Sequence, residues 1–101
     1  MNSFYFGTNN LLTGQAAPFT GASIPTANAR NVLVSTYGSG AGAISIQYPS
    51  PIFDGQWVTF YNVTGLTTGY GVPLSIDSPM PKIRAISSGN GNFWAAVYQQ
   101  N

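Results

Sequence analysis

Alternation of apolar and polar residues is the main pattern of this chain from residue 31 onward. Within the stretch 43–48, Ile44 and Ile46 alternate with Ser45 and Gln47, which is typical of a half-buried β-strand. Similar runs rich in β-branched and aromatic residues predict six strands, at 32–37, 43–48, 56–62, 73–77, 82–87 and 93–99. The predicted core residues are Val34, Ile44, Ile46, Val58, Phe60, Ile76, Ile83 and Trp94.

Turn-forming residues separate the expected strands. The glycine-rich run 38–42 and the run 88–92, which contains Asn-Gly, are predicted to be hairpin loops. Asp54, Gly55 and Gln56 form a third turn after a proline-rich strand end, with Asp54 as the turn former. Short strands joined by short loops indicate a mainly β fold, an antiparallel β-sandwich or small barrel.

The first 31 residues are less regular than the rest. Glycine and proline interrupt an Ala- and Thr-rich stretch without sustained helical periodicity, so no long helix is expected there. We expect residues 1–31 to form an extended arm or irregular segment and residues 32–101 to form the β-domain. The arm either packs on its own domain or lies on a neighbouring subunit. The candidate residues for docking on a partner are Phe4, Tyr5, Phe6 and Leu11.

Charge is scarce in this chain of 101 residues, a length that suits one domain. Only 5% of its residues are charged and 14% are aromatic, whereas ordinary soluble domains carry about 25% charged residues. Interface cores are depleted in charge and enriched in aromatic residues, so much of the surface is expected to be contact surface in a homo-oligomer. A net charge of +1 argues against binding to nucleic acid.

Targeting signals are equally sparse. No apolar run approaches the length of a membrane span, and the first residues do not resemble a signal peptide. We therefore expect the chain to be made and used, or assembled into something larger, in the cytosol.

Catalytic chemistry is almost missing from the sequence. The chain has no cysteine and no histidine, which removes thiolate metal sites and the commonest general base. Asp54 and Asp77 are the only carboxylate side chains, and both are expected at turns or strand ends. We therefore expect no enzyme activity, no catalytic, cofactor-binding or metal-ligating residue, and no cofactor.

Several aromatic and basic residues allow two interpretations. Trp57, Tyr61 and Tyr70 are candidates for a glycan- or partner-binding face, because flat rings suit sugars, and Trp94 and Tyr98 are candidates for the same sugar-stacking platform. Core or interface packing is the commoner role of such residues. Lys82 and Arg84 share one face of a predicted strand. They either meet an acidic patch on a partner or form a solvated, edge-protecting face.

The segment 44–65 resembles a stretch that recurs in virion structural proteins of tailed bacteriophages, including capsid decoration, head-fibre and tail-fibre β-domains. The resemblance lies in a strand ending in Pro49, the Pro-x-x-Asp-Gly-Gln run 51–56, the Val-Thr-Phe run 58–60, and Asn62 and Gly65. A later aromatic strand at Phe93-Trp94 extends the resemblance over roughly residues 43–98. No stalk-like repeat is present, which favours a capsid-surface protein over a long fibre.

The resemblance implies a role in the virion. It suggests an oligomeric capsid decoration, cement or short head-spike protein, expected to be a trimer. Such a protein would be assembled in the host cytoplasm and bound to the major capsid protein or another virion protein. The alternative is a glycan- or receptor-binding β-module of a phage fibre.

Overall fold

The computed structural model describes residues 6–27, 31–70, 74–76 and 81–100. The regular elements in these ranges are all strands, and none of the described residues forms a helix that could cross a membrane. The strands are β1 (Phe6–Ala16), β2 (Phe19–Thr20), β3 (Ile24–Pro25), β4 (Asn31–Pro49), β5 (Trp57–Tyr70), β6 (Leu74–Ile76), β7 (Lys82–Gly89) and β8 (Asn92–Gln100). All the pairings are antiparallel, which confirms the predicted fold class.

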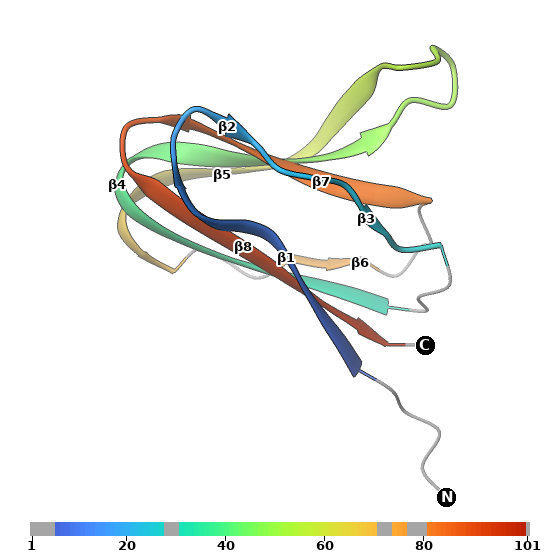
Figure 1. The fold of residues 1–101 in the computed structure, drawn as a ribbon, viewed down its shortest axis with the longest axis horizontal. Coiled ribbons are helices and arrows are strands. Elements are labelled where there is room, and N and C mark those ends of the chain that lie inside the picture. Colours follow the sequence, from blue (N-terminus) through green and yellow to red (C-terminus); the bar gives the residue numbers. More distant parts are fainter. Residues whose placement is uncertain (1–5, 28–30, 71–73, 77–80, 101) are drawn as a thin grey trace, which may run out of the picture.

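The long strand β4 is the central strand of the sheet. Its second half pairs with β7, with Gln47 opposite Arg84, and its first half pairs with β8, with Asn31 opposite Gln100. The register stays constant through both pairings, so β7 and β8 are successive parts of one bent strand. Figure 1 shows them following β4 around the same corner.

The remaining strands follow the same path. β1 pairs with β8, and β2 and β3 pair with β7. β5 and β6 pair with the edge of β4 opposite to the one that holds β7 and β8. The domain is therefore one sheet folded over on itself, in the spatial order β1 to β3, β7 with β8, β4, and β5 with β6 (Figure 1). The folded sheet forms two layers and is nearly closed into a small barrel.

The two predicted glycine loops are instead the crease of this sheet. Residues 38–42 lie inside β4, and the run 88–92 carries the chain from β7 into β8 without a hairpin. The backbone N–H of Asn90 donates to the carbonyl of Ala41 at 2.7 Å, which keeps the two bends together. Both loop predictions are wrong because glycine serves equally well in a turn and in a sharply bent strand.

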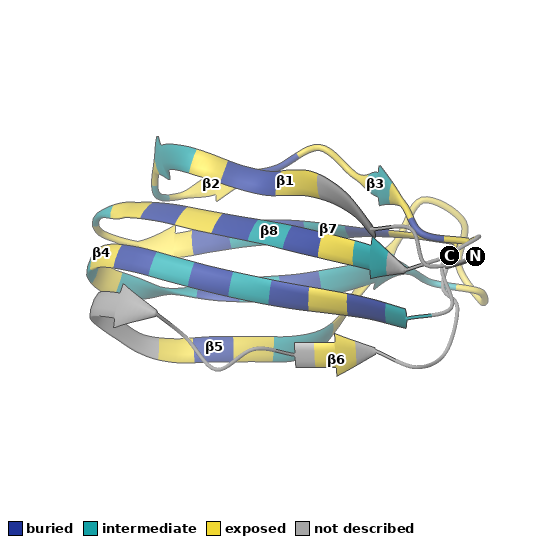
Figure 2. Cartoon of the chain, turned by 90° about the horizontal axis from the view of Figure 1, so that it is seen from below, coloured by how far each residue is buried: buried dark blue, intermediate teal, exposed yellow. Residues whose placement is uncertain are grey.

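The inner faces of the two layers form the hydrophobic core. Buried and exposed residues alternate along β4 and β8 in Figure 2, as the two-residue period of a strand requires. The buried apolar residues are Leu11, Leu12, Val32, Val34, Ile44, Ile46, Val63, Ile83, Ala85, Phe93, Ala95 and Val97.

Two predicted core residues lie on the surface instead. Val58 is 37% exposed because it pairs with Tyr48, beyond the last β4–β7 pair at Gln47, where the hairpin extends past the core. Trp94 is 40% exposed, and its neighbour Phe93 occupies the core. Val34, Ile44, Ile46 and Ile83 are buried as predicted, Phe60 packs against the core, and the side chain of Ile76 lies outside the described side chains.

The segment expected to be irregular contains a long strand, β1. β1 pairs with β8 along its length, and a bulge between Asn10 and Leu12 lets two consecutive leucines face the core. The described part of the expected arm, residues 6–27, is thus extended and lies in the sheet of its own chain. The division into an arm at 1–31 and a β-domain at 32–101 stays a prediction.

Candidate functional site

The outer surface of β4 and β8 carries a row of exposed apolar side chains. The register places Leu33 opposite Tyr98 and Tyr37 opposite Trp94, with a small polar–apolar pair between them. We call this row the ladder face; its residues are Leu33, Ser35, Tyr37, Trp94, Ala96 and Tyr98. It exists because the alternate residues of both strands fill the core, so these six must face outward.

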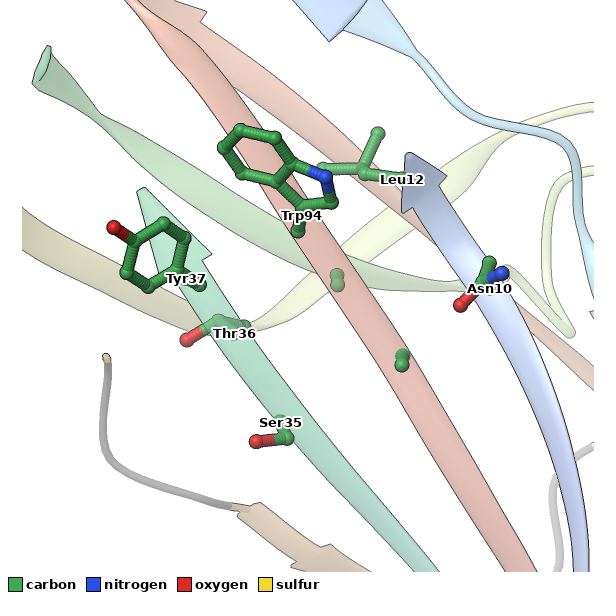
Figure 3. Close-up of a pocket in the computed structure, with 8 residues that line it drawn as sticks. Asn10, Leu12, Ser35, Thr36, Tyr37 and Trp94 are labelled. Carbon is green, nitrogen blue, oxygen red and sulfur yellow. The ribbon is translucent and has the colours of Figure 1, made fainter. Parts of the chain in front are cut away.

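A hollow of about 210 Å³ lies at one end of the ladder face (Figure 3). It is lined by Asn10, Leu12, Ser35, Thr36, Tyr37, Trp94, Ala95 and Ala96, which come from β1, β4 and β8. The rings of Tyr37 and Trp94 are tilted against each other with centroids 5.5 Å apart. These eight residues include no carboxylate or cationic side chain, so the hollow suits an apolar or aromatic group with a few neutral hydrogen-bonding partners.

Glycine at position 14 makes room for the Trp94 indole. A Cβ atom on Gly14 would lie 2.7 Å from Cζ2 of that ring. Next to this contact, the side-chain amide of Asn92 donates to the Gly14 carbonyl at 2.7 Å. The exposed indole is therefore held in place by β1.

The hairpin between β4 and β5 forms a second apolar surface, and it projects from the sheet in Figure 1. At its tip, Ile52 is 78% exposed and Phe53 is 66% exposed. A shallow hollow of about 580 Å³ is lined by Ser50, Ile52, Phe53, Asp54, Gln56, Trp57 and Val58. The predicted turn at Asp54-Gly55 is present, with Gly55 at a φ of 80°.

Trp57 begins β5 and lies next to two cations from β7. The Arg84 guanidinium is 4.2 Å from the Trp57 ring centroid, and the Lys82 ammonium is 5.6 Å from the same centroid. Arg84 Nε donates to Gln47 Oε1 at 2.9 Å, and Gln47 Nε2 donates to Thr59 Oγ1 at 3.0 Å. A polar row thus crosses β7, β4 and β5 and holds the guanidinium over the indole.

The residues predicted for docking do not form a group that the structure describes. Phe4 and Tyr5 lie outside the described residues, and Phe6 begins β1 with a side chain that is not described. Leu11 is 3% exposed and packs in the core of its own chain. Its side chain is therefore not on the surface, where a docking role would need it.

Among the residues predicted for a glycan-binding face, Trp94 and Tyr98 share the ladder face, but the described side chains do not all lie on one surface. Trp57 lies on the outer side of the sheet beside Arg84, whereas Tyr61 packs against the core. Tyr70 ends β5 opposite Tyr37, and its side chain is not among those described. The predicted turn residues Asp54, Gly55 and Gln56 do stand together at the hairpin tip.

The sequence did not predict the ladder face as one surface, because its two strands, β4 and β8, are far apart in the sequence. The signal that could have found it is the placement of large side chains an even number of residues apart, Leu33 and Tyr37 in one strand and Trp94 and Tyr98 in the other. The exposed tip residues Ile52 and Phe53 had a simpler signal, since they sit between turn residues where a core side chain is not expected.

Comparisons with known proteins bear on the fold. No protein-family model and no curated protein sequence matches this chain. Among solved structures, the SPBc2 prophage-derived protein YomS superposes with a TM-score of 0.71 at 12% identity, over 100% of this chain and 97% of that chain. A chain from the Bacillus endospore appendages, described as a novel family of disulfide-linked pili, gives a TM-score of 0.48 at 11% identity, over 98% and 88% of the two chains.

A third neighbour, PirA, gives a TM-score of 0.41 at 16% identity, over 100% of this chain and 95% of that chain. The inference of a shared fold rests on YomS alone. This chain has the same all-β architecture over its whole length as a protein of prophage origin.

Proposed function

We propose that this chain is a non-enzymatic structural protein of a phage particle, which acts as an oligomeric capsid decoration, cement or short head-spike protein. The observation that carries the proposal is the ladder face, a row of exposed Leu, Tyr and Trp side chains on a rigid sheet. Contiguous exposed apolar surface of this kind marks protein contact sites.

Apolar contacts made by several linked copies would attach the chain to the particle. A buried aromatic side chain removes about 150–250 Å² from water, and apolar area contributes about 25 cal/mol per Å². Burying Trp94 and Tyr98 against a partner would thus supply several kcal/mol per copy before the loss of rotational and translational freedom. Copies linked in one oligomer would bind the particle at several points at once, which turns such modest contacts into stable attachment.

Two likenesses support the phage particle as the setting. YomS, which shares the fold, is described as prophage-derived. Independently, the Pro-x-x-Asp-Gly-Gln run at 51–56 resembles virion structural proteins of tailed phages, and it forms an ordered, projecting hairpin here. The scarcity of charge on a chain this small fits a subunit that is largely covered by its neighbours.

Quantitative mass spectrometry of purified particles tests the proposal. Particles from cells that express the chain should contain it in a fixed ratio to the major capsid protein. A tagged chain carrying Leu33→Thr and Tyr98→Thr should be lost from the particles, while a Thr59→Ser control should be retained. A chain that is absent from purified particles would contradict the proposal.

A second candidate function is a glycan- or receptor-binding module of a fibre, and the hollow at Trp94 is the observation that favours it. An exposed indole beside the neutral polar side chains of Asn10 and Ser35 is a plausible sugar platform. Glycan-array binding that is lost on Trp94→Ala and kept on Trp57→Ala would support this second function.

A further inference from the structure

The hairpin between β4 and β5 brings exposed apolar side chains and both signs of charge to one end of the molecule. We call this region the tip surface; its residues are Ile52, Phe53, Asp54, Trp57, Lys82 and Arg84. The apolar part is the exposed pair Ile52 and Phe53. Asp54 and Trp57 line the same shallow hollow as that pair, and Trp57 connects it to the two cations.

Local hydrogen bonds order the tip surface before any partner arrives. Ser50 Oγ accepts from the backbone N–H groups of Ile52 and Phe53, both at 3.1 Å. The backbone N–H of Gln56 donates to the Phe53 carbonyl at 3.2 Å, and Ser50 N–H donates to the Gln56 carbonyl at 2.8 Å. A preorganised loop loses little conformational freedom on binding, which favours its use as a contact.

The charges of the tip surface lack opposite charges among the residues that the structure describes. No ion pair to Asp54, Lys82 or Arg84 occurs within the described part of the chain. Lys82 and Arg84 flank one indole ring, so two like charges are held close together. An incoming carboxylate would relieve this repulsion, and the planar guanidinium is well shaped to bind one.

We propose that the tip surface binds the tip surface of a second copy of this chain, with Asp54 of each copy facing Arg84 and Lys82 of the other. The choice of a second copy rests on charge complementarity. One surface carries an unpaired carboxylate, a pair of cations and an apolar centre, which is the composition that a self-complementary contact needs. Ile52 and Phe53 of the two copies pack together in the middle.

This inference deepens the proposed function, because it names the contact through which the subunits assemble. It assigns a different surface to each partner. The tip surface joins copies of the chain to one another, and the ladder face stays free to bind the phage particle. Trp57 and Arg84 supply residue types that dominate binding energy in protein interfaces, and Phe53 is of a type enriched in interface cores.

Charge reversal with mixing tests the contact in the full-length chain. We expect the wild-type chain to self-associate in sedimentation velocity experiments, and Asp54→Lys and Arg84→Glu each to weaken association by about 10-fold or more. An equimolar mixture of the two variants should associate again, because the introduced lysine of one copy then meets the introduced glutamate of the other. Restoration by mixing is the result that a merely structural role would not produce.

Control variants distinguish the effect of the Asp54 charge from the effect of Asp54 on the turn. Asp54→Asn keeps a residue suited to the turn and removes the charge, so it should weaken association without changing the thermal unfolding midpoint. It also replaces Asp54→Lys if that variant does not fold. Ile52→Ser with Phe53→Ser should weaken association to the same extent or more.

Three results would overturn the inference: a wild-type chain that stays monomeric at high concentration, charge variants that associate like the wild type, or a mixture that associates no better than its components. A monomeric chain that is still incorporated into particles would contradict the tip contact and the oligomeric state, and would leave the proposed place in the phage particle standing. A chain that self-associates through the tip but is absent from particles would contradict only the proposed function.

Discussion

Gly40 and Gly91 lie directly against each other at the crease of the folded sheet. A Cβ atom on Gly40 would lie 2.6 Å from the Cα of Gly91, and one on Gly91 would lie 2.8 Å from the Cα of Gly40. Both residues have positive φ angles, of 131° and 124° respectively. This close approach of two backbones lets β4 and its partner strand bend together, which turns one long sheet into two packed layers.

Replacing either crease glycine with alanine should destabilise the fold strongly. Gly40→Ala and Gly91→Ala each add a strained backbone and a clash with the facing strand, for an expected loss of about 3 kcal/mol or more in the free energy of unfolding. Urea unfolding followed by circular dichroism measures this loss.

Gly55 provides the matched control. It also has a positive φ, but nothing lies within 4 Å of a Cβ atom placed there. Gly55→Ala should therefore cost only about 1 kcal/mol, from backbone strain alone. Equal losses at Gly40 and Gly55 would show that the crease contact contributes nothing.

Thr36→Val should stabilise the domain. Thr36 is 3% exposed, and its Oγ1 has no hydrogen-bond partner in the described part of the chain. Valine has nearly the same shape without the unsatisfied hydroxyl, so the unfolding free energy should rise by about 1 kcal/mol and the melting temperature by about 4 °C or more. Thr59→Val is the control, because the Thr59 hydroxyl accepts from Gln47 and its removal should bring no gain. A lower melting temperature for Thr36→Val would refute the prediction.

Arg84 and Gln47 should be energetically coupled. The guanidinium is held over Trp57 by its hydrogen bond to Gln47, and both side chains are partly removed from water. A double-mutant cycle with Arg84→Ala and Gln47→Ala should give a coupling energy of about 0.5–1.5 kcal/mol in urea unfolding. Tryptophan fluorescence should change with Arg84→Ala, since the cation leaves the indole. Strictly additive losses of stability in the two single variants would mean that the hydrogen bond to Gln47 does not position Arg84.

The ladder face should contribute little to folding. Leu33 and Tyr98 are exposed, Tyr98 by 51%, so Leu33→Thr and Tyr98→Thr should each change the unfolding free energy by no more than about 0.5 kcal/mol. Ile44 is fully buried, and Ile44→Ala should cost about 2–5 kcal/mol. Thermal unfolding distinguishes the two classes. A large loss from the ladder substitutions would make them unsuitable as probes of association and would indicate a structural role.

The sequence by itself determined the class of the fold and most of its strands. Alternation at 43–48 and the aromatic-rich run at 93–99 predict strands whatever their neighbours are, because period and residue preference are local properties. The turn at Asp54-Gly55 was equally predictable, since proline, aspartate and glycine favour turns through their own backbone preferences. Four of the predicted core residues, including Ile44 and Ile46, are buried because the apolar face of each strand packs against the second layer.

Only the tertiary structure decided whether the glycine-rich runs form hairpin turns or bends within a strand. It alone also decided which residues face outward. Glycine at positions 38–42 and 89–91 permits either a hairpin or a bent strand, and the choice depends on a partner strand that bends at the same place. Alternation also assigns residues to two faces without saying which one is inside. Phe93 is buried and Trp94 exposed because the second layer folds over the Phe93 side, and that is a property of the whole sheet.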